Sequence, residues 1–345
     1  MKKNYPEITK LRGFAILMVL LYHSIIVYPI DLRAIGWCKN LAEVLWQIEM
    51  PLFFLVSGFC YSYEDKYSTY VVKKVKRILI PHVVFGIIDL MFRVLPKYIP
   101  FMGNLVNEKT TLWDGAKEFV VYASIDPFLR SLFIMFLVFP FIAKLIKRGK
   151  TAKYLLFIAA LLLYIFSDRI TPVTALSYTA RFFIYFLIGY MVKDNVYEKV
   201  KTLILRPLMV FGSGILAVLS FVCYLLPGMK AATDIFVIEK LLLFIAAVSA
   251  AVVMYAVANM GLGVLQHLVT MAGNYSLQLY LFGGYVLVVS RLVVVTYLGI
   301  EMPALVILLN FVMDILIMCP IIHFIVRKVR LFCFLTGLTC KKKNK

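Results

Sequence analysis

The chain has 345 residues, of which 63% are hydrophobic and 16% are charged, and its mean hydropathy is +0.91. A soluble domain carries roughly 25% charged and ~45–50% apolar residues. This composition excludes an ordinary cytosolic enzyme, a disordered chain and a secreted disulfide scaffold. The apolar residues come in blocks of about 15–24, the length at which a helix crosses a ~30 Å hydrocarbon layer. We therefore predict an all-α fold, a polytopic bundle of membrane helices.

Basic residues outnumber acidic ones, with 37 Lys and Arg against 18 Asp and Glu and a formal net charge of +19. In a soluble protein this excess would suggest nucleic-acid binding. Here the basic residues lie in short segments between apolar blocks, and no soluble basic domain is present. We therefore expect membrane lipids, and no nucleic acid, among the partners.

About ten segments are apolar and long enough to be predicted as membrane spans. They are residues 13–30, 42–63, 78–95, 126–146, 153–167, 178–192, 207–227, 236–258, 271–290 and 303–326. No small-residue cleavage site follows the first apolar run, so we expect a retained first helix. Residues 1–345 are predicted to form one membrane domain, embedded over about 13–326, with 327–345 as a basic cytoplasmic tail.

The positions of the basic residues predict the orientation. If the N-terminus is cytoplasmic, most Lys and Arg fall in the inside segments, as the positive-inside rule requires. We therefore predict that both termini are cytoplasmic and that the protein is a multi-pass protein of the cell membrane.

Ionisable side chains within the spans cost at least ~2.5–3.5 kcal/mol at mid-membrane, so each is a candidate functional residue. They are His23, Glu49, Asp89 with Arg93, Arg130, Arg181, Glu239 with Lys240, and Asp314. Asp89 and Arg93 are four residues apart and are expected to neutralise each other. The other histidines fall near predicted cytoplasmic helix ends, where we expect contact with water; these are His82, His267 and His323.

Arg12 and His23 are predicted to lie on one face of the first helix. They are eleven residues apart, and that separation is within about 20° of three full helical turns and spans about 16 Å. Arg12 would lie at the inner surface and His23 at mid-depth. This arrangement suits a protein that binds an anion at the surface and performs chemistry midway. The alternative is a structural histidine bonded to a neighbouring helix.

The second span brackets His23 with two polar residues, because it runs antiparallel to the first. Ser57 should lie about 9 Å and Glu49 about 21 Å from the inner surface. Ser57 could donate a hydrogen bond to a developing oxyanion, and Glu49 could orient the imidazole or bind an acceptor hydroxyl. Alternatively, Ser57 and Gly58 form a small-residue contact between helices.

The third span begins with a basic cluster that includes Lys74, Lys76 and Arg77. Such residues often mark only topology and lipid contact. Because they lie one hairpin away from Arg12, they could also clamp a polyphosphate. The six cysteines show no CxxC spacing, so we expect neither a metal site nor a catalytic thiol.

Three motifs follow one another along the first three spans. Arg12 and His23 form an R-x10-H pattern, residues 50–59 read MPLFFLVSGF, and residues 74–81 read KVKRILIP. This order closely resembles the integral-membrane acyltransferase family 3, the O-acetyltransferases that modify bacterial surface polysaccharides and other glycans. Weaker matches at 128–133, 181–190 and 273–281 extend the resemblance over nearly the whole chain.

The resemblance implies that His23 is catalytic and Arg12 essential. It also implies a bacterial inner membrane and an acyl-CoA donor, most directly acetyl-CoA, bound as a substrate and not as a resident cofactor. We expect Arg12, Lys74, Lys76 and Arg77 to bind this donor. We expect the substrate-binding residues to be Glu49, Ser57, Arg130 and Arg181. Two positions depart from the family pattern, since Pro127 replaces a common Trp and Gly283 a common His.

The predicted function is therefore that of a membrane O-acyltransferase. It would transfer an acyl group, which we expect to be acetyl, to a hydroxyl of a glycan or lipid-linked sugar, with His23 as the general base. No Ser or Cys nucleophile is flanked by a base in the sequence, which favours direct transfer over an acyl-enzyme. The alternative is a carrier or flippase for a lipid-linked glycan. The acceptor could approach from outside or from the inner mouth.

Overall fold

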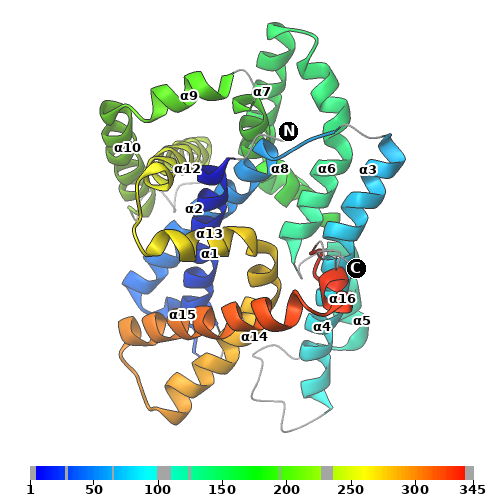
Figure 1. Cartoon of the computed structure of the whole chain (residues 1–345), viewed down its shortest axis with the longest axis vertical. Helices are drawn as coiled ribbons and strands as arrows, with labels where there is room; N and C mark the ends of the chain where they lie inside the picture. Colours follow the sequence, from blue (N-terminus) through cyan, green and yellow to red (C-terminus); the bar gives the residue numbers. More distant parts are fainter. Residues whose placement is uncertain are drawn as a thin grey trace, which may run out of the picture.

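The computed structural model describes residues 5–27, 30–63, 66–98, 110–122, 126–193, 196–226 and 236–338. Every regular element within these ranges is helical (Figure 1). The α-helices are α1 (Pro6–Ile26), α2 (Gly36–Phe59), α3 (Tyr67–Lys74), α4 (Ile80–Val94), α5 (Leu112–Lys117), α6 (Pro127–Ile146), α7 (Lys150–Ile165), α8 (Leu176–Val192), α9 (Tyr197–Ile204), α10 (Pro207–Leu225), α12 (Phe236–Asn259), α13 (Leu265–Asn274), α14 (Ser276–Leu292), α15 (Pro303–Pro320) and α16 (Arg330–Leu335). The π-helical segments are η2 (Val75–Leu79), η5 (Glu118–Tyr122), η10 (Val293–Tyr297) and η11 (Ile321–Val326). Short 3-10 turns are η1 (Leu32–Ala34), η3 (Leu95–Lys97), η6 (Ser167–Arg169) and η7 (Val173–Ala175).

The predicted all-α, polytopic bundle is confirmed. In the described part of the chain, eight helical segments are long and apolar enough to cross a membrane. They correspond to eight of the ten predicted spans. The other two, 78–95 and 153–167, are α4 and α7, which have 15 and 16 residues.

The structure changes two predicted boundaries. The first helix begins at Pro6, so Arg12 lies inside it and not just before it; proline suits a first helical position, because its missing N–H would have no partner there. The predicted span 271–290 is two helices, α13 and α14. They are separated at Tyr275, whose φ of −111° and ψ of 21° interrupt the helix.

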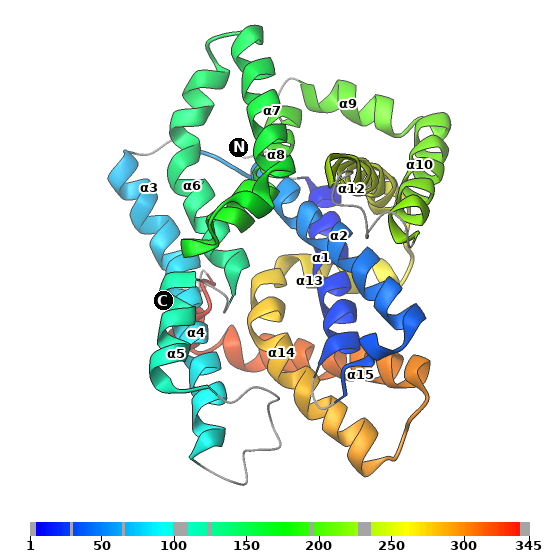
Figure 2. The same ribbon diagram turned by 180° about the vertical axis from the view of Figure 1, so that it is seen from behind.

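The helix α1 lies in the middle of the molecule. It packs against α2, α12, α13, α14 and α15, and both views show α14 and α15 passing close to its lower half (Figures 1 and 2). Its crossing with α13 requires glycine. A Cβ on Gly13 would lie 2.0 Å from the carbonyl oxygen of Val269, and one on Gly273 would lie 2.0 Å from that of Thr9.

A second glycine crossing joins α2 to α8. A Cβ on Gly58 would lie 1.9 Å from the carbonyl oxygen of Phe186, and one on Gly189 would lie 1.9 Å from that of Leu55. Small residues of this kind let membrane helices approach closely. The predicted small-residue contact is therefore confirmed for Gly58, and it holds the neighbouring Ser57 at a defined place on α2.

The first part of the predicted basic tail folds back onto the bundle. Gln278 on α14 donates a hydrogen bond of 2.8 Å to the carbonyl oxygen of Thr336. Gly337 has a left-handed φ of +67° and lies against the backbone of Arg77. Residues 339–345, the rest of that predicted tail, lie outside the described residues.

Candidate functional site

A cavity of about 320 Å³, here called the basic cavity, collects three cations from two parts of the chain. Arg12 comes from α1, Lys74 from the end of α3 and Arg77 from η2, and Ser57 of α2 also lines the wall. Lys74 and Arg77 reach the same cavity because residues three apart share a helix face. The folded-back tail completes the wall with Leu338 and its neighbouring glycine.

Two of these cations are partly withdrawn from water. The Nε of Arg12 is buried and has no hydrogen-bond partner among the described residues. The Lys74 amine lies over the Phe136 ring, 3.5 Å from its centroid. Burial lowers the pKa of Lys74 to about 8, and the charge of Arg77 acts in the same direction. Lys76, by contrast, is exposed and does not line the cavity.

A second cavity, here called the histidine cavity, has a volume of about 530 Å³ and contains His23. The Nδ1 of His23 lies 2.8 Å from the carbonyl oxygen of Val19. Because a carbonyl only accepts, Nδ1 is the donor in this hydrogen bond, and in the neutral imidazole Nε2 then carries the free lone pair. Asp89 and Arg93 form the expected ion pair at 3.0 Å and line the same cavity.

The two cavities meet at Tyr280 of α14, whose side chain lines both of them. The helix α1 connects them as well, because Arg12 faces the basic cavity and His23 the histidine cavity. The structure thus places the predicted anion-binding residue and the predicted base in adjoining spaces.

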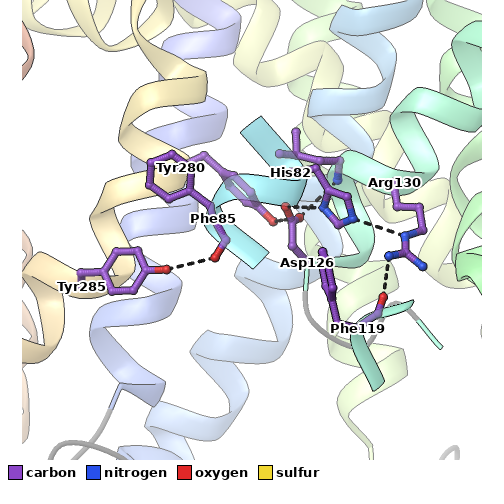
Figure 3. A network of polar contacts seen from close by, with 8 residues as sticks. His82, Phe85, Phe119, Asp126, Arg130, Tyr280 and Tyr285 are labelled. Atoms are coloured by element: carbon purple, nitrogen blue, oxygen red, sulfur yellow. Dashed lines mark hydrogen bonds and ion pairs between the residues drawn. The ribbon is translucent and has the colours of Figure 1, made fainter. Parts of the chain in front are cut away.

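A polar network fixes Tyr280 (Figure 3). Its hydroxyl donates to Asp126 Oδ1 at 2.8 Å, and His82 Nδ1 lies 3.2 Å from Asp126 Oδ2. Arg130 Nε donates to His82 Nε2 at 3.3 Å. Since a guanidinium only donates, His82 Nε2 is the acceptor and Nδ1 carries the proton toward Asp126. His82 therefore bridges a carboxylate and a cation.

The expectation that His82 contacts water is wrong. Its side chain is 1% exposed, because α4 packs against α5 and the His82 ring lies 5.3 Å from the Phe119 ring of η5, centroid to centroid. Asp126 is not among the site residues predicted from the sequence. Its position directly before Pro127 is typical of a helix start, and Asp126 does accept a hydrogen bond from the Leu129 amide. That signal predicts a cap and carries no indication of the contacts with His82 and Tyr280.

The remaining predicted substrate-binding residues line neither cavity. Arg130 donates to the carbonyl of Val120 at 2.7 Å as well as to His82. Arg181 pairs with Asp168 at 3.3 Å, and Lys240 reaches the same carboxylate at 2.6 Å. Their contact with a substrate stays a prediction.

Two carboxylates are buried without a hydrogen-bond partner among the described residues, Glu49 on α2 and Asp314 on α15. In the described ranges, no three His, Cys, Asp or Glu side chains are grouped as metal ligands. The residues best placed to hold a polyanion are those of the basic cavity.

These observations define a polytopic helical membrane protein in which a cationic cavity adjoins a cavity that contains a histidine. Residues 5–323 match a family described as an acyltransferase domain, acyltransferase family 3. The chain belongs to this family and is a membrane acyltransferase, as the motifs predicted. No curated protein and no solved structure matches the chain.

Proposed function

We propose that this protein is an O-acyltransferase that transfers an acyl group, most directly acetyl, from acyl-CoA to a hydroxyl of a glycan or lipid-linked sugar in the cell membrane. The observation that carries the proposal is the position of Tyr280, which lines both the basic cavity and the histidine cavity. An acyl-CoA donor whose phosphates bind in the basic cavity can extend its acyl arm into the histidine cavity.

The basic cavity suits the donor because CoA is a polyanion. Arg12 and Arg77 provide guanidinium groups, which can each form two charge-assisted hydrogen bonds with a phosphate. The buried Arg12 Nε lacks a partner among the described residues, and an unpaired buried donor is costly until a ligand accepts from it. Lys74 adds a third positive charge to the same wall.

In this proposal His23 acts as the general base. Its Nε2 takes the proton of the acceptor hydroxyl while that oxygen attacks the thioester carbonyl carbon. The predicted hydrogen bond from Ser57 to the negatively charged carbonyl oxygen requires that this oxygen stay at the wall of the basic cavity, which Ser57 lines. The carbon–sulfur bond then breaks, the imidazolium returns the proton to the departing thiolate, and an O-acyl ester and free CoA are formed.

The test is a CoA-release assay on the purified protein with acetyl-CoA and a panel of glycan acceptors. We expect CoA release that depends on the acceptor, with the acyl group recovered as an ester on a sugar hydroxyl. Acceptor movement across a vesicle membrane without any CoA release would contradict the proposal and favour the carrier alternative. Family membership supports acyl transfer over that alternative.

A further inference from the structure

A third cavity, of about 660 Å³, opens near the end of α1 that lies away from Arg12. We call it the aromatic cleft. Its wall is formed by the last part of α1, the η1 turn, the first half of α2 and the end of α10. The volume is within the range of about 300–1,000 Å³ that small-molecule sites occupy.

Three aromatic side chains line the cleft: Tyr22, Trp46 and Tyr224. The ring centroids of Tyr22 and Trp46 are 5.5 Å apart, and Trp46 also packs on Tyr178 at 6.4 Å. Trp46 is therefore half-buried between aromatic neighbours, unlike a tryptophan that anchors a helix at the lipid interface. Trp113 on α5 is, by contrast, 79% exposed.

The polar part of the wall carries no net charge. Asp31 and Arg33 pair with each other, with Arg33 Nε 3.0 Å and 2.9 Å from the two carboxylate oxygens. Lys39 and Glu43 add one charge of each sign, and Gln47 provides an amide that both donates and accepts. The cleft thus differs from the basic cavity, whose charged residues are all cations.

We infer that the aromatic cleft is a subsite for an uncharged oligosaccharide, the part of the acceptor glycan beyond the sugar that receives the acyl group. A sugar ring presents apolar C–H faces and a rim of hydroxyls. Aromatic rings can cover the apolar C–H faces. Hydrogen-bond donors and acceptors with zero net charge can pair with the hydroxyls.

The cleft also lies next to the proposed base. The Tyr22 ring meets the His23 imidazole edge-to-face with centroids 5.2 Å apart, so adjacent residues of α1 face the aromatic cleft and the histidine cavity. We take the acceptor glycan to extend from Tyr22 toward the neighbouring residue His23. That the bound saccharide is the acceptor rests on the proposed function. The inference itself is that the aromatic cleft binds a neutral saccharide.

Tryptophan fluorescence of the full-length protein in detergent tests the binding without any acyl transfer. The chain has three tryptophans, and the probes are maltotetraose, cellotetraose, chitotetraose and mannotetraose, each titrated without acetyl-CoA. We expect at least one to quench the fluorescence saturably. The quench should disappear in Trp46→Phe and persist in the matched control Trp113→Phe. Gln47→Ala should raise Kd roughly three- to tenfold, the effect of one lost hydrogen bond.

The outcomes separate this inference from the proposed function. Saturable, Trp46-dependent quenching with no acyl transfer would leave the subsite standing and overturn the proposed reaction. Acyl transfer without saturable quenching by any of the four tetrasaccharides would overturn the subsite alone. Tighter binding of an acidic oligosaccharide such as tetragalacturonate, or quenching that survives Trp46→Phe, would also overturn the inference.

Discussion

The Tyr280 hydroxyl donates a hydrogen bond to Asp126 Oδ1 over 2.8 Å, joining α14 to the first residue before α6. Tyr280 lines both the basic cavity and the histidine cavity, and Asp126 lines the latter. The residue at which the two spaces meet is thus fixed by a carboxylate that His82 also holds. The shape of this junction depends on that network.

Replacing Asp126 with Ala should destabilise the protein. Three donors lose their acceptor, namely the Tyr280 hydroxyl, the His82 ring and the Leu129 amide. We expect the free energy of unfolding to fall by about 2–3 kcal/mol, because the loss combines a helix cap with buried unpaired groups. Tyr280→Phe removes one bond and should cost about 1 kcal/mol. Chemical denaturation in detergent measures both.

A double-variant cycle tests whether these residues act as one network. In Tyr280→Phe combined with Asp126→Ala, the Tyr280 bond is already absent once Asp126 is gone, so the combined loss should be smaller than the sum. Strictly additive losses would show that the two side chains contribute independently, against the network described here.

His23→Ala should abolish acyl transfer while acetyl-CoA binding is retained. Loss of a general base costs roughly 10²–10⁴-fold in rate, and the donor-binding cations lie in the other cavity. CoA release and equilibrium binding of acetyl-CoA are the two measurements. His267→Ala is the control, because His267 is exposed on α13 and lines neither cavity. Wild-type turnover in His23→Ala would return His23 to a structural role.

Neighbouring basic residues should differ in donor binding. Arg77→Gln removes a cation that lines the basic cavity, whereas Lys76→Gln removes one that is exposed outside it. We expect the Kd for acetyl-CoA to rise roughly tenfold or more in Arg77→Gln, the loss of a charge-assisted hydrogen bond, and to stay unchanged in Lys76→Gln. Arg12→Lys should retain part of the affinity, because an amine lacks the two-pronged geometry of a guanidinium. Equal affinities of the Arg77 and Lys76 variants for acetyl-CoA would show that this basic cluster sets the membrane topology and does not bind the donor.

Donor binding should weaken as the pH rises through about 8. Lys74 has a pKa lowered to about 8 by burial, so it is charged below that pH and neutral above it. A polyanion binds the charged form better, which makes the Kd for acetyl-CoA increase between about pH 7 and 9. In Lys74→Arg the cation persists through this range, and the dependence should vanish. A pH-dependent Kd of the same size in Lys74→Arg would assign the titration to another group.

The acceptor should be acylated on the side opposite the donor. The aromatic cleft lies toward the end of α1 away from Arg12, and the charge distribution predicts that the Arg12 end is cytoplasmic. Inside-out vesicles given external acetyl-CoA, with the acceptor enclosed, should form product. Product formed only when the acceptor is outside with the CoA would mean that both substrates use the inner mouth, with the role of His23 unaffected.

The helices could be predicted because they follow from local geometry, and the same geometry gave the prediction that Arg12 and His23 share a face. An apolar block long enough to span a bilayer is visible residue by residue, and a separation of eleven residues determines a relative direction on any helix. The same geometry explains why Lys74, at the end of α3, and Arg77, in η2, line the basic cavity while Lys76 does not. The family motifs added the expected chemistry, and the match over residues 5–323 confirmed the family.

The sequence by itself determined the class of protein and eight of its ten predicted spans, and it predicted the residues that suit a donor and a base. Only the tertiary structure decided which distant residues meet: His82 with Asp126, Tyr280 with both cavities, and Tyr22 with Trp46 in the aromatic cleft. Residues such as Asp126 and Tyr280 are 154 positions apart. Their contact depends on how α6 and α14 pack around α1, and no periodicity within either helix encodes that packing.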